Sequence, residues 1–126
     1  MSGLEEFHSR FFQAEALDEC VVASFHEGPL DEEQNIEELG RSLYQLIDQH
    51  GFRRVAVDLS ETPFVSSGVL GKLITLHRRL HRAEGQLVLC GLQASVHEVL
   101  RRSNLLEYFQ VADSRDCALT QLGSSQ

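Results

Sequence analysis

Two adjacent serines, Ser66 and Ser67, are the residues whose position could carry chemistry. They lie where an expected loop passes into an expected helix over residues 67–82. The first N–H groups of a helix have no partner within the helix, and the helix dipole places partial positive charge there. Ser66 is positioned to cap this helix, and the same terminus would accommodate a phosphate on Ser67. The two serines therefore predict either a simple cap or a phosphorylation site.

Other catalytic and metal-binding patterns are weaker. The serines do not lie in a GxSxG context, and the sequence contains neither a GxxxxGK[ST] loop nor a GxGxxG loop. His77 and His81 lie one helical turn apart, but without an HExxH pattern or an evident third ligand they predict no metal site. Cys20, Cys90 and Cys117 are too widely spaced for a CxxC zinc site, and their odd number argues against a disulfide framework. We therefore expect a protein that is not an enzyme and that uses no cofactor.

The charge of the chain is acidic overall and unevenly distributed. The net charge is −8 and the isoelectric point is about 5.1, which argues against general binding to nucleic acid. Residues 1–50 contain 12 acidic and 2 basic residues, whereas residues 51–126 contain 7 acidic and 9 basic residues. The basic residues include Arg78-Arg79, Arg82 and Arg101-Arg102. They indicate either a solvated helix face or a patch that docks a partner.

Apolar spacing predicts the elements that position the serines. We expect strands over residues 11–17, 20–25, 55–59, 87–90 and 108–111. We expect a first helix that begins near Asp31 and is ended by Gly51, and further helices over residues 67–82, 94–103 and up to Leu119, the last capped by Asp113 or Ser114.

The order of these elements predicts an α/β fold. The first two strands are separated by Asp18-Glu19 and should form an antiparallel hairpin. From residue 53 onward strands and helices alternate, which is typical of parallel strands joined by right-handed crossovers. We therefore expect a small mixed sheet with about four helices.

The length of 126 residues suits one domain. We assign residues 1–10 to an N-terminal extension, residues 11–120 to the domain and residues 121–126 to a flexible tail. No apolar run approaches the roughly 18 residues needed to cross a membrane, and no signal peptide is visible. We expect a cytoplasmic protein without membrane insertion, and no heptad pattern indicates an oligomeric state.

Several segments together resemble the STAS domain, the family of bacterial anti-sigma factor antagonists. The resemblance covers about residues 11–120. It rests on the strand Val55–Leu59, the loop Phe64–Gly68, the helix Val69–Leu80, the segments Gly85–Gly91 and Val96–Leu105, and the earlier loop Gly28–Asp31. In an open α/β sheet, the loops that follow the strands are where partners usually bind.

The resemblance implies a regulatory protein that binds a kinase-type anti-sigma factor and thereby frees a sigma factor. Phosphorylation of the second serine of the motif by a serine protein kinase ends the interaction, and a phosphatase reverses it. Ser67 matches that phosphoacceptor. The partner-binding residues that we expect are Asp31, Val65, Ser66, Ser67, Gly68 and Lys72.

The sequence departs from the family at one position of this motif. Val65 stands where the family has an aspartate. The alternative function is therefore a STAS scaffold subunit of a larger signalling or transport complex, which uses the same surface without phosphorylation.

Overall fold

The computed structural model describes residues 9–26 and 33–123. Five strands and four helices occur in these residues. In chain order they are β1 (Phe12–Leu17), β2 (Cys20–Phe25), α1 (Glu33–Asp48), β3 (Arg54–Asp58), α2 (Ser67–Arg82), β4 (Gln86–Cys90), α3 (Ala94–Arg102), β5 (Gln110–Ala112) and α4 (Arg115–Gln121).

The strands form one mixed sheet in the order β1-β2-β3-β4-β5. β1 and β2 are antiparallel, and their register places Leu17 opposite Cys20, so that Asp18 and Glu19 form the tight turn between them. Every later pairing, from β2 with β3 to β4 with β5, is parallel. The mixed sheet with its opening hairpin is thus confirmed.

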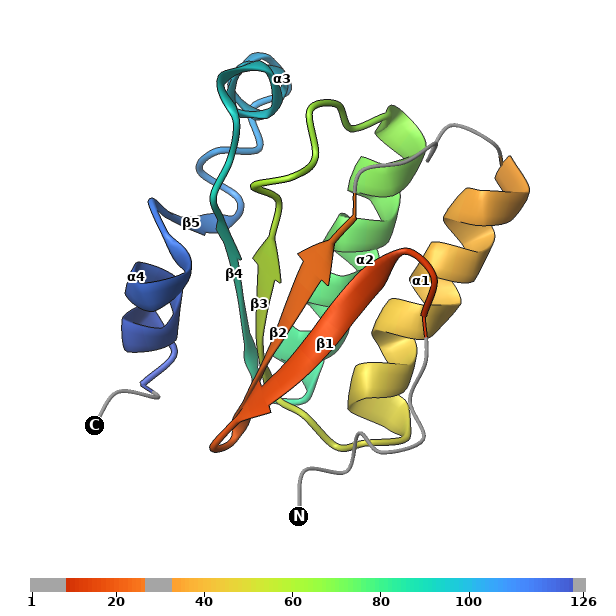
Figure 1. Cartoon of the computed structure of the whole chain (residues 1–126), viewed down its shortest axis with the longest axis vertical. Helices are drawn as coiled ribbons and strands as arrows, with labels where there is room; N and C mark the ends of the chain where they lie inside the picture. Colours follow the sequence, from red (N-terminus) through yellow and green to blue (C-terminus); the bar gives the residue numbers. More distant parts are fainter. Residues whose placement is uncertain (1–8, 27–32, 124–126) are drawn as a thin grey trace.

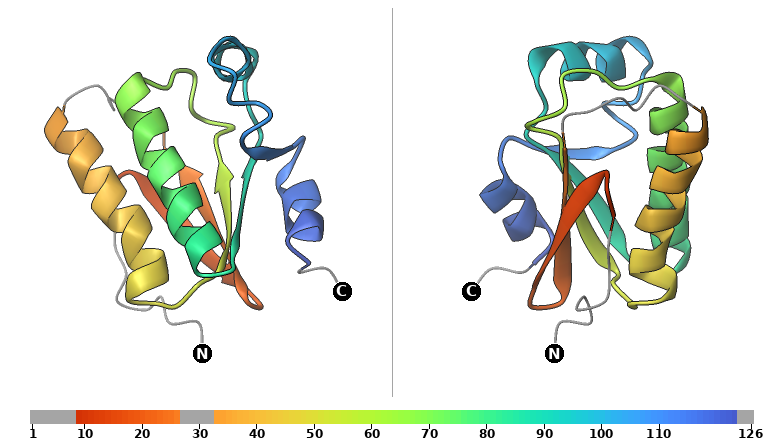
Figure 2. Two further views of the ribbon diagram at one scale, coloured as in Figure 1. Left: turned by 180° about the vertical axis from the view of Figure 1, so that it is seen from behind. Right: turned by 45° about the vertical axis from the view of Figure 1, so that its right-hand side comes forward.

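Helices cover both faces of the sheet (Figures 1 and 2). α1 and α2 lie side by side on one face, and α4 lies on the other, against β3, β4 and β5. Because strand side chains alternate between faces, β2 contributes Val21 and Ala23 to the core beneath α1 and α2, and Cys20 and Val22 to the core beneath α4. The core beneath α1 and α2 contains most of the buried leucines.

Most element boundaries agree with the sequence to within a few residues. The helix predicted over residues 67–82 is confirmed at both ends. The expected start of α1 at Asp31, like the whole Gly28–Asp31 loop, lies outside the described residues. α1 ends at Asp48, and Gly51 follows it with a φ of 75° and an N–H that donates to Ile47.

The last strand is the clearest difference. We predicted it over residues 108–111, but β5 comprises Gln110–Ala112. The N–H groups of Tyr108 and Phe109 donate to the carbonyl oxygen of Leu105, so these aromatics belong to the turn before the strand. Phe109 is nevertheless buried in the larger core. An apolar turn residue that packs into the core therefore gives the same sequence signal as a strand residue.

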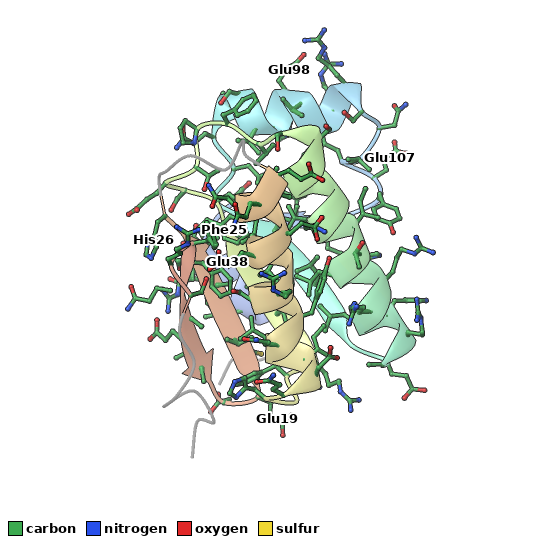
Figure 3. The ribbon with its side chains drawn as sticks, turned by 90° about the vertical axis from the view of Figure 1, so that its right-hand side faces the viewer. Glu19, Phe25, His26, Glu38, Glu98 and Glu107 are labelled. Carbon is green, nitrogen blue, oxygen red and sulfur yellow. The ribbon has the colours of Figure 1, made fainter. Side chains whose placement is uncertain are left out.

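The parallel sheet brings the starts of three helices to one end of the molecule. α2 and α3 both begin beyond the carboxyl ends of the strands that precede them, and α1 also begins at this end (Figure 1). Figure 3 shows the same arrangement with side chains, with Glu38 projecting from α1 and Glu98 from α3. The loop that carries the two serines joins β3 to α2 at this end.

Candidate functional site

The loop between β3 and α2 is held in place by hydrogen bonds at both of its sides. The N–H of Ser60 donates to the Asp58 carboxylate at 3.0 Å. From the start of α3, Gln93 donates to the carbonyl oxygen of Ser60 at 2.9 Å and Ser95 donates to that of Pro63 at 2.6 Å. α3 therefore positions the loop that leads to the serines.

Ser66 is the N-cap of α2, as its sequence position predicted. Its backbone is extended, with φ −87° and ψ 168°, and its hydroxyl accepts a hydrogen bond from the N–H of Val69 at 3.2 Å. The Ser66 carbonyl oxygen accepts the N–H of Leu70 at 3.0 Å. The hydroxyl of Ser66 is thus engaged in starting the helix.

Ser67 is the first residue of α2 and is exposed. Within the described part of the chain its hydroxyl has no hydrogen-bond partner. It stands beside N–H groups of the first helical turn, where the helix favours negative charge. Among the described residues, a group added to this hydroxyl would displace no existing hydrogen bond.

The two residues before the serines face opposite ways. Val65, which we expected among the partner-binding residues, is 4% exposed and belongs to the larger core. Phe64 is 66% exposed, although it is a large apolar side chain. We expected the 60–68 loop to contact a partner but did not name Phe64 among the partner-binding residues, because an isolated aromatic residue beside a proline gives no sign of which way it faces. Aromatic side chains are enriched at protein–protein interfaces, so an exposed Phe64 on an anchored loop is a candidate contact residue for a protein partner.

A groove of about 450 Å³ runs beside Ser67 between the first halves of α1 and α2. Its lining residues are Glu33, Ile36, Glu37, Gly68, Gly71, Lys72 and Thr75. The helices approach closely at Gly68, where a Cβ atom would lie 2.8 Å from Cδ1 of Ile36. At Gly71 a Cβ atom would meet nothing within 4 Å, so the groove is open there. The residues contributed by α1 gave no separate signal in the sequence.

Lys72 is the charged residue that links the two sides of this groove. Its ammonium group lies 3.0 Å from the carboxylate of Glu37, and its side chain is 21% exposed. Its aliphatic stem passes over Gly40, where a Cβ atom would lie 2.8 Å from Cδ of Lys72. The structure thus brings Ser66, Ser67, Gly68 and Lys72 together at one end of α2, while Asp31 lies outside the described residues.

The two histidines on α2 have aromatic neighbours. The ring of His77 lies 6.4 Å from that of His81 and 4.7 Å from that of Tyr108, measured between centroids.

Across residues 9–26 and 33–123, no group of three or more His, Cys, Asp or Glu side chains could hold a metal ion. In the same residues, no helix is long and apolar enough to cross a membrane.

Comparisons with known proteins agree on one family. The model of the STAS domain matches residues 12–118. The candidate anti-sigma factor antagonist BtrV of Bordetella bronchiseptica is 38% identical over 84 residues, which cover 67% of this chain and 72% of that protein.

Two solved structures show the same fold. A candidate anti-sigma factor antagonist of Thermotoga maritima gives a TM-score of 0.82 at 17% identity, with 90% of this chain and 96% of that chain covered. The phosphorylated form of SpoIIAA from Bacillus gives a TM-score of 0.67 at 20% identity, with 87% and 97% covered.

Proposed function

The chain belongs to the STAS-domain family and is similar to anti-sigma factor antagonists, and from this premise we propose that it binds a kinase-type anti-sigma factor and releases it when Ser67 is phosphorylated. The observation that carries the proposal is the exposed Ser67 at the start of α2, between the exposed Phe64 and the groove along α1 and α2. A phosphorylated form is known for the structural neighbour SpoIIAA, which supports a phosphorylation switch in this chain.

The different roles of the two serine hydroxyls support a switch at Ser67. The Ser66 hydroxyl accepts a hydrogen bond from the helix, so its modification would remove the cap. The Ser67 hydroxyl takes no part in the cap, and the helix terminus would stabilise a phosphate there. Phosphorylation at Ser67 would therefore change the surface of the protein and leave its fold intact.

The expected effect on the partner is electrostatic. A phosphoserine carries about −1.5 to −2 charges at neutral pH. A partner seated on Phe64 and on the groove would have to desolvate these charges, beside the carboxylates of Glu33 and Glu37. A cost of about 3 kcal/mol would weaken binding by roughly a hundredfold.

The second candidate function is a scaffold subunit that is not phosphorylated. The observation that favours it is Val65, which places a buried apolar side chain where the motif has an acid. In that case the same surface, including Phe64, would assemble a stable complex. A Ser67→Ala variant would then be fully functional in cells, and Ser67 would carry no phosphate.

The test is a capture experiment from native cell extract with matched baits, followed by affinity measurements with the purified partner. The baits are the wild-type chain, Ser67→Asp, and Ser103→Asp, which adds the same charge at the exposed end of α3. We expect a kinase-type partner to be lost from Ser67→Asp alone and phosphate to be found on Ser67 of the wild-type chain. Equal capture by all three baits with no phosphate on Ser67 would refute the switch and favour the scaffold.

A further inference from the structure

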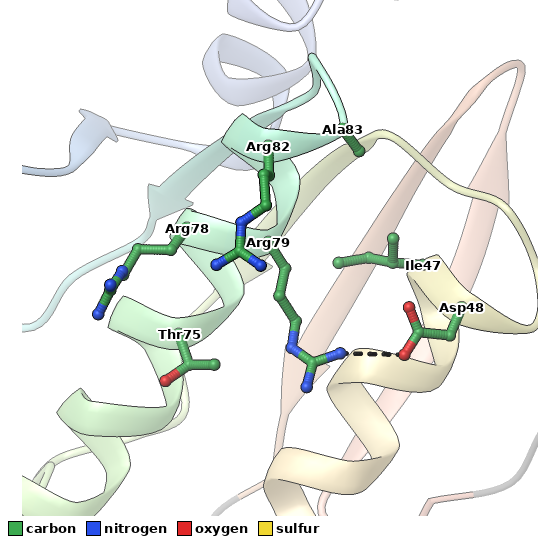
Figure 4. Close-up of a pocket in the computed structure, with 7 residues that line it drawn as sticks. All are labelled: Ile47, Asp48, Thr75, Arg78, Arg79, Arg82 and Ala83. Carbon is green, nitrogen blue, oxygen red and sulfur yellow. Dashed lines mark hydrogen bonds and ion pairs between the residues drawn. The ribbon is translucent and has the colours of Figure 1, made fainter.

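A second groove lies between the last halves of α1 and α2, at the end of the helices away from Ser67 (Figure 4). It has a volume of about 620 Å³ and is lined by Ile47, Asp48, Thr75, Arg78, Arg79, Arg82 and Ala83. Three arginines and one aspartate therefore face a hollow in a chain whose net charge is −8. The basic groove, as we call it, opposes the charge of the molecule as a whole.

The three arginines are not equivalent. Arg79 donates to the carboxylate of Asp48 at 3.0 Å, and its guanidinium lies 4.2 Å from the centroid of the Tyr44 ring. These contacts hold Arg79 against α1. Arg78 and Arg82 have no acidic partner and no hydrogen bond among residues 9–26 and 33–123. Figure 4 shows the Arg82 guanidinium between the side chains of Arg78 and Arg79, and the Arg78 side chain extended on the side of α2 away from Asp48.

The spacing of this pair on α2 suits the binding of carboxylates. Arg78 and Arg82 are four residues apart on α2, so they are neighbours on one face of the helix. Each guanidinium can bind a carboxylate or phosphate through two parallel hydrogen bonds. The last turn of a helix favours cations, which accounts in part for the presence of Arg82. This interaction with the helix end does not occupy the N–H donors of its guanidinium, which can therefore bind a ligand.

We propose that the basic groove binds an acidic segment of a protein partner, with Arg78 and Arg82 each receiving a carboxylate. Charge complementarity favours this occupant. The net charge of −8 repels an acidic segment from most of the surface, so such a segment would bind where the arginines gather. The groove contains few apolar side chains, chiefly Ile47 and Ala83, so it offers no apolar pocket for a large flat ligand.

The position of the basic groove indicates which protein would supply the segment. Thr75 lines both this groove and the one beside Ser67, so the two grooves adjoin along α2, and together we call them the furrow. In identifying the segment as part of the same partner, the inference rests on the proposed function. Ser67 and Arg82 are 15 residues apart on α2, a distance of about 22 Å along the helix. A partner that spans the furrow would therefore have one end at the switch and an acidic end at the arginines.

The test uses a defined probe and the whole chain. A hexaglutamate peptide is titrated into the protein at 0.1 M salt, and the Nε–H signals of arginine side chains are followed by NMR. We expect saturable shifts at Arg78 and Arg82, and an affinity that falls as salt is added. The variant Arg78→Gln/Arg82→Gln should bind at least about tenfold more weakly, as expected when two charged contacts are lost. Circular dichroism and the melting temperature establish that it is folded.

The matched control is Arg101→Gln/Arg102→Gln, which removes the same charge from the end of α3. It should bind the peptide within about twofold of wild type, because these arginines lie on a different helix. Equal weakening by both double variants, or shifts that do not saturate, would overturn the proposal. A saturable affinity for pyrophosphate more than tenfold higher than for hexaglutamate would also overturn it, in favour of a phosphate ligand.

The Ser67→Asp variant separates this inference from the proposed function. We expect it to bind hexaglutamate like wild type, because about 22 Å exceeds two Debye lengths at 0.1 M salt. If hexaglutamate binds the arginines but the captured partner does not respond to Ser67→Asp, the switch fails and the groove stands. If the partner responds to Ser67→Asp but hexaglutamate does not bind, the groove fails and the switch stands.

Discussion

Ser66 and Ser67 are neighbours in the chain, yet among the described residues only the Ser66 hydroxyl accepts a hydrogen bond at the start of α2. We therefore expect Ser66→Ala to lower the free energy of unfolding by about 1 kcal/mol, because the N–H of Val69 loses its acceptor. Ser67→Ala should change it by less than about 0.5 kcal/mol, as usual for an exposed position. Urea unfolding at constant pH measures both values. Equal losses in the two variants would contradict this assignment of the cap.

His77 is the second residue whose surroundings give a testable property. Burial, with a smaller contribution from the charge of His81, lowers the pKa of His77 below its usual value of 6.5. Its Nδ1 atom is buried without a hydrogen-bond partner in the described part of the chain. Below pH 6.5 the unfolded chain therefore binds a proton at this residue more readily than the folded chain does. The stability associated with neutral His77 is complete above pH 6.5 and falls as the pH drops below that value.

A series of urea unfolding curves between pH 7.5 and pH 5 tests this expectation. His77→Phe keeps an aromatic ring beside Tyr108 and removes the titrating group. We expect the unfolding free energy of this variant to fall less steeply below pH 6.5 than that of wild type. His97→Gln, at an exposed position on α3, is the control and should follow wild type. Parallel curves for wild type and His77→Phe would show that His77 does not contribute.

At the scale of elements, alanine substitutions at two glycines of the α2 region should change stability in opposite directions. At Gly85, in the turn between α2 and β4, a Cβ atom would lie 2.2 Å from the carbonyl oxygen of Arg53. Gly85→Ala must displace backbone and should destabilise the protein by about 2 kcal/mol. At Gly71, inside α2, a Cβ atom meets nothing within 4 Å, so Gly71→Ala should stabilise by roughly 0.5–1 kcal/mol. Thermal unfolding of the pair measures both, and a loss of stability in Gly71→Ala would contradict the open position seen here.

The elements themselves were largely predictable because their signals are local. The apolar spacing of α2 and the serine before it predicted both of its ends, and the short β1–β2 turn predicted the hairpin. The predicted start of β5 was wrong because of Phe109. A buried apolar residue in a turn cannot be distinguished by sequence from a buried apolar residue in a strand. The meeting of α1 and α2 at Gly68 depends on contacts between distant residues, so the grooves could not be predicted from local pattern.

The same distinction holds for the candidate site as a whole. The position of Ser67 at a helix start follows from its neighbours in the chain, and the sequence predicted it. The exposure of Phe64 and the burial of Val65 depend on how the loop is anchored by α3, through Ser95 and Gln93. The basic residues of α2 were visible in the sequence, but which of them are already paired with α1 was not.

At the scale of the whole molecule, the layer formed by α4 protects two of the three cysteines. Cys20 and Cys90 are fully buried in the core beneath α4, whereas Cys117 on α4 is exposed. Burial raises the pKa of Cys90 to about 12, and the nearby charge of Asp58 adds to this effect while Arg115 opposes it. Since the thiolate is the reactive form, both burial and pKa protect Cys90. We expect a thiol-specific reagent at pH 8 to label one cysteine rapidly in the folded chain and all three in guanidinium chloride.

The labelling rate of the buried Cys20 and Cys90 then measures how often α4 separates from the sheet. Cys117→Ser should abolish the rapid phase and leave the slow one unchanged, because Cys117 contributes no buried side chain. Leu122→Ala removes a buried side chain at the end of α4 and should accelerate labelling of Cys20 and Cys90. Labelling of Cys20 and Cys90 requires α4 to separate from the sheet. Because the seven residues of α4 bury fewer side chains than α1 and α2 do, this local opening should cost less free energy than global unfolding. Rapid labelling of two or three thiols in the wild-type chain would mean that α4 does not cover the sheet in solution.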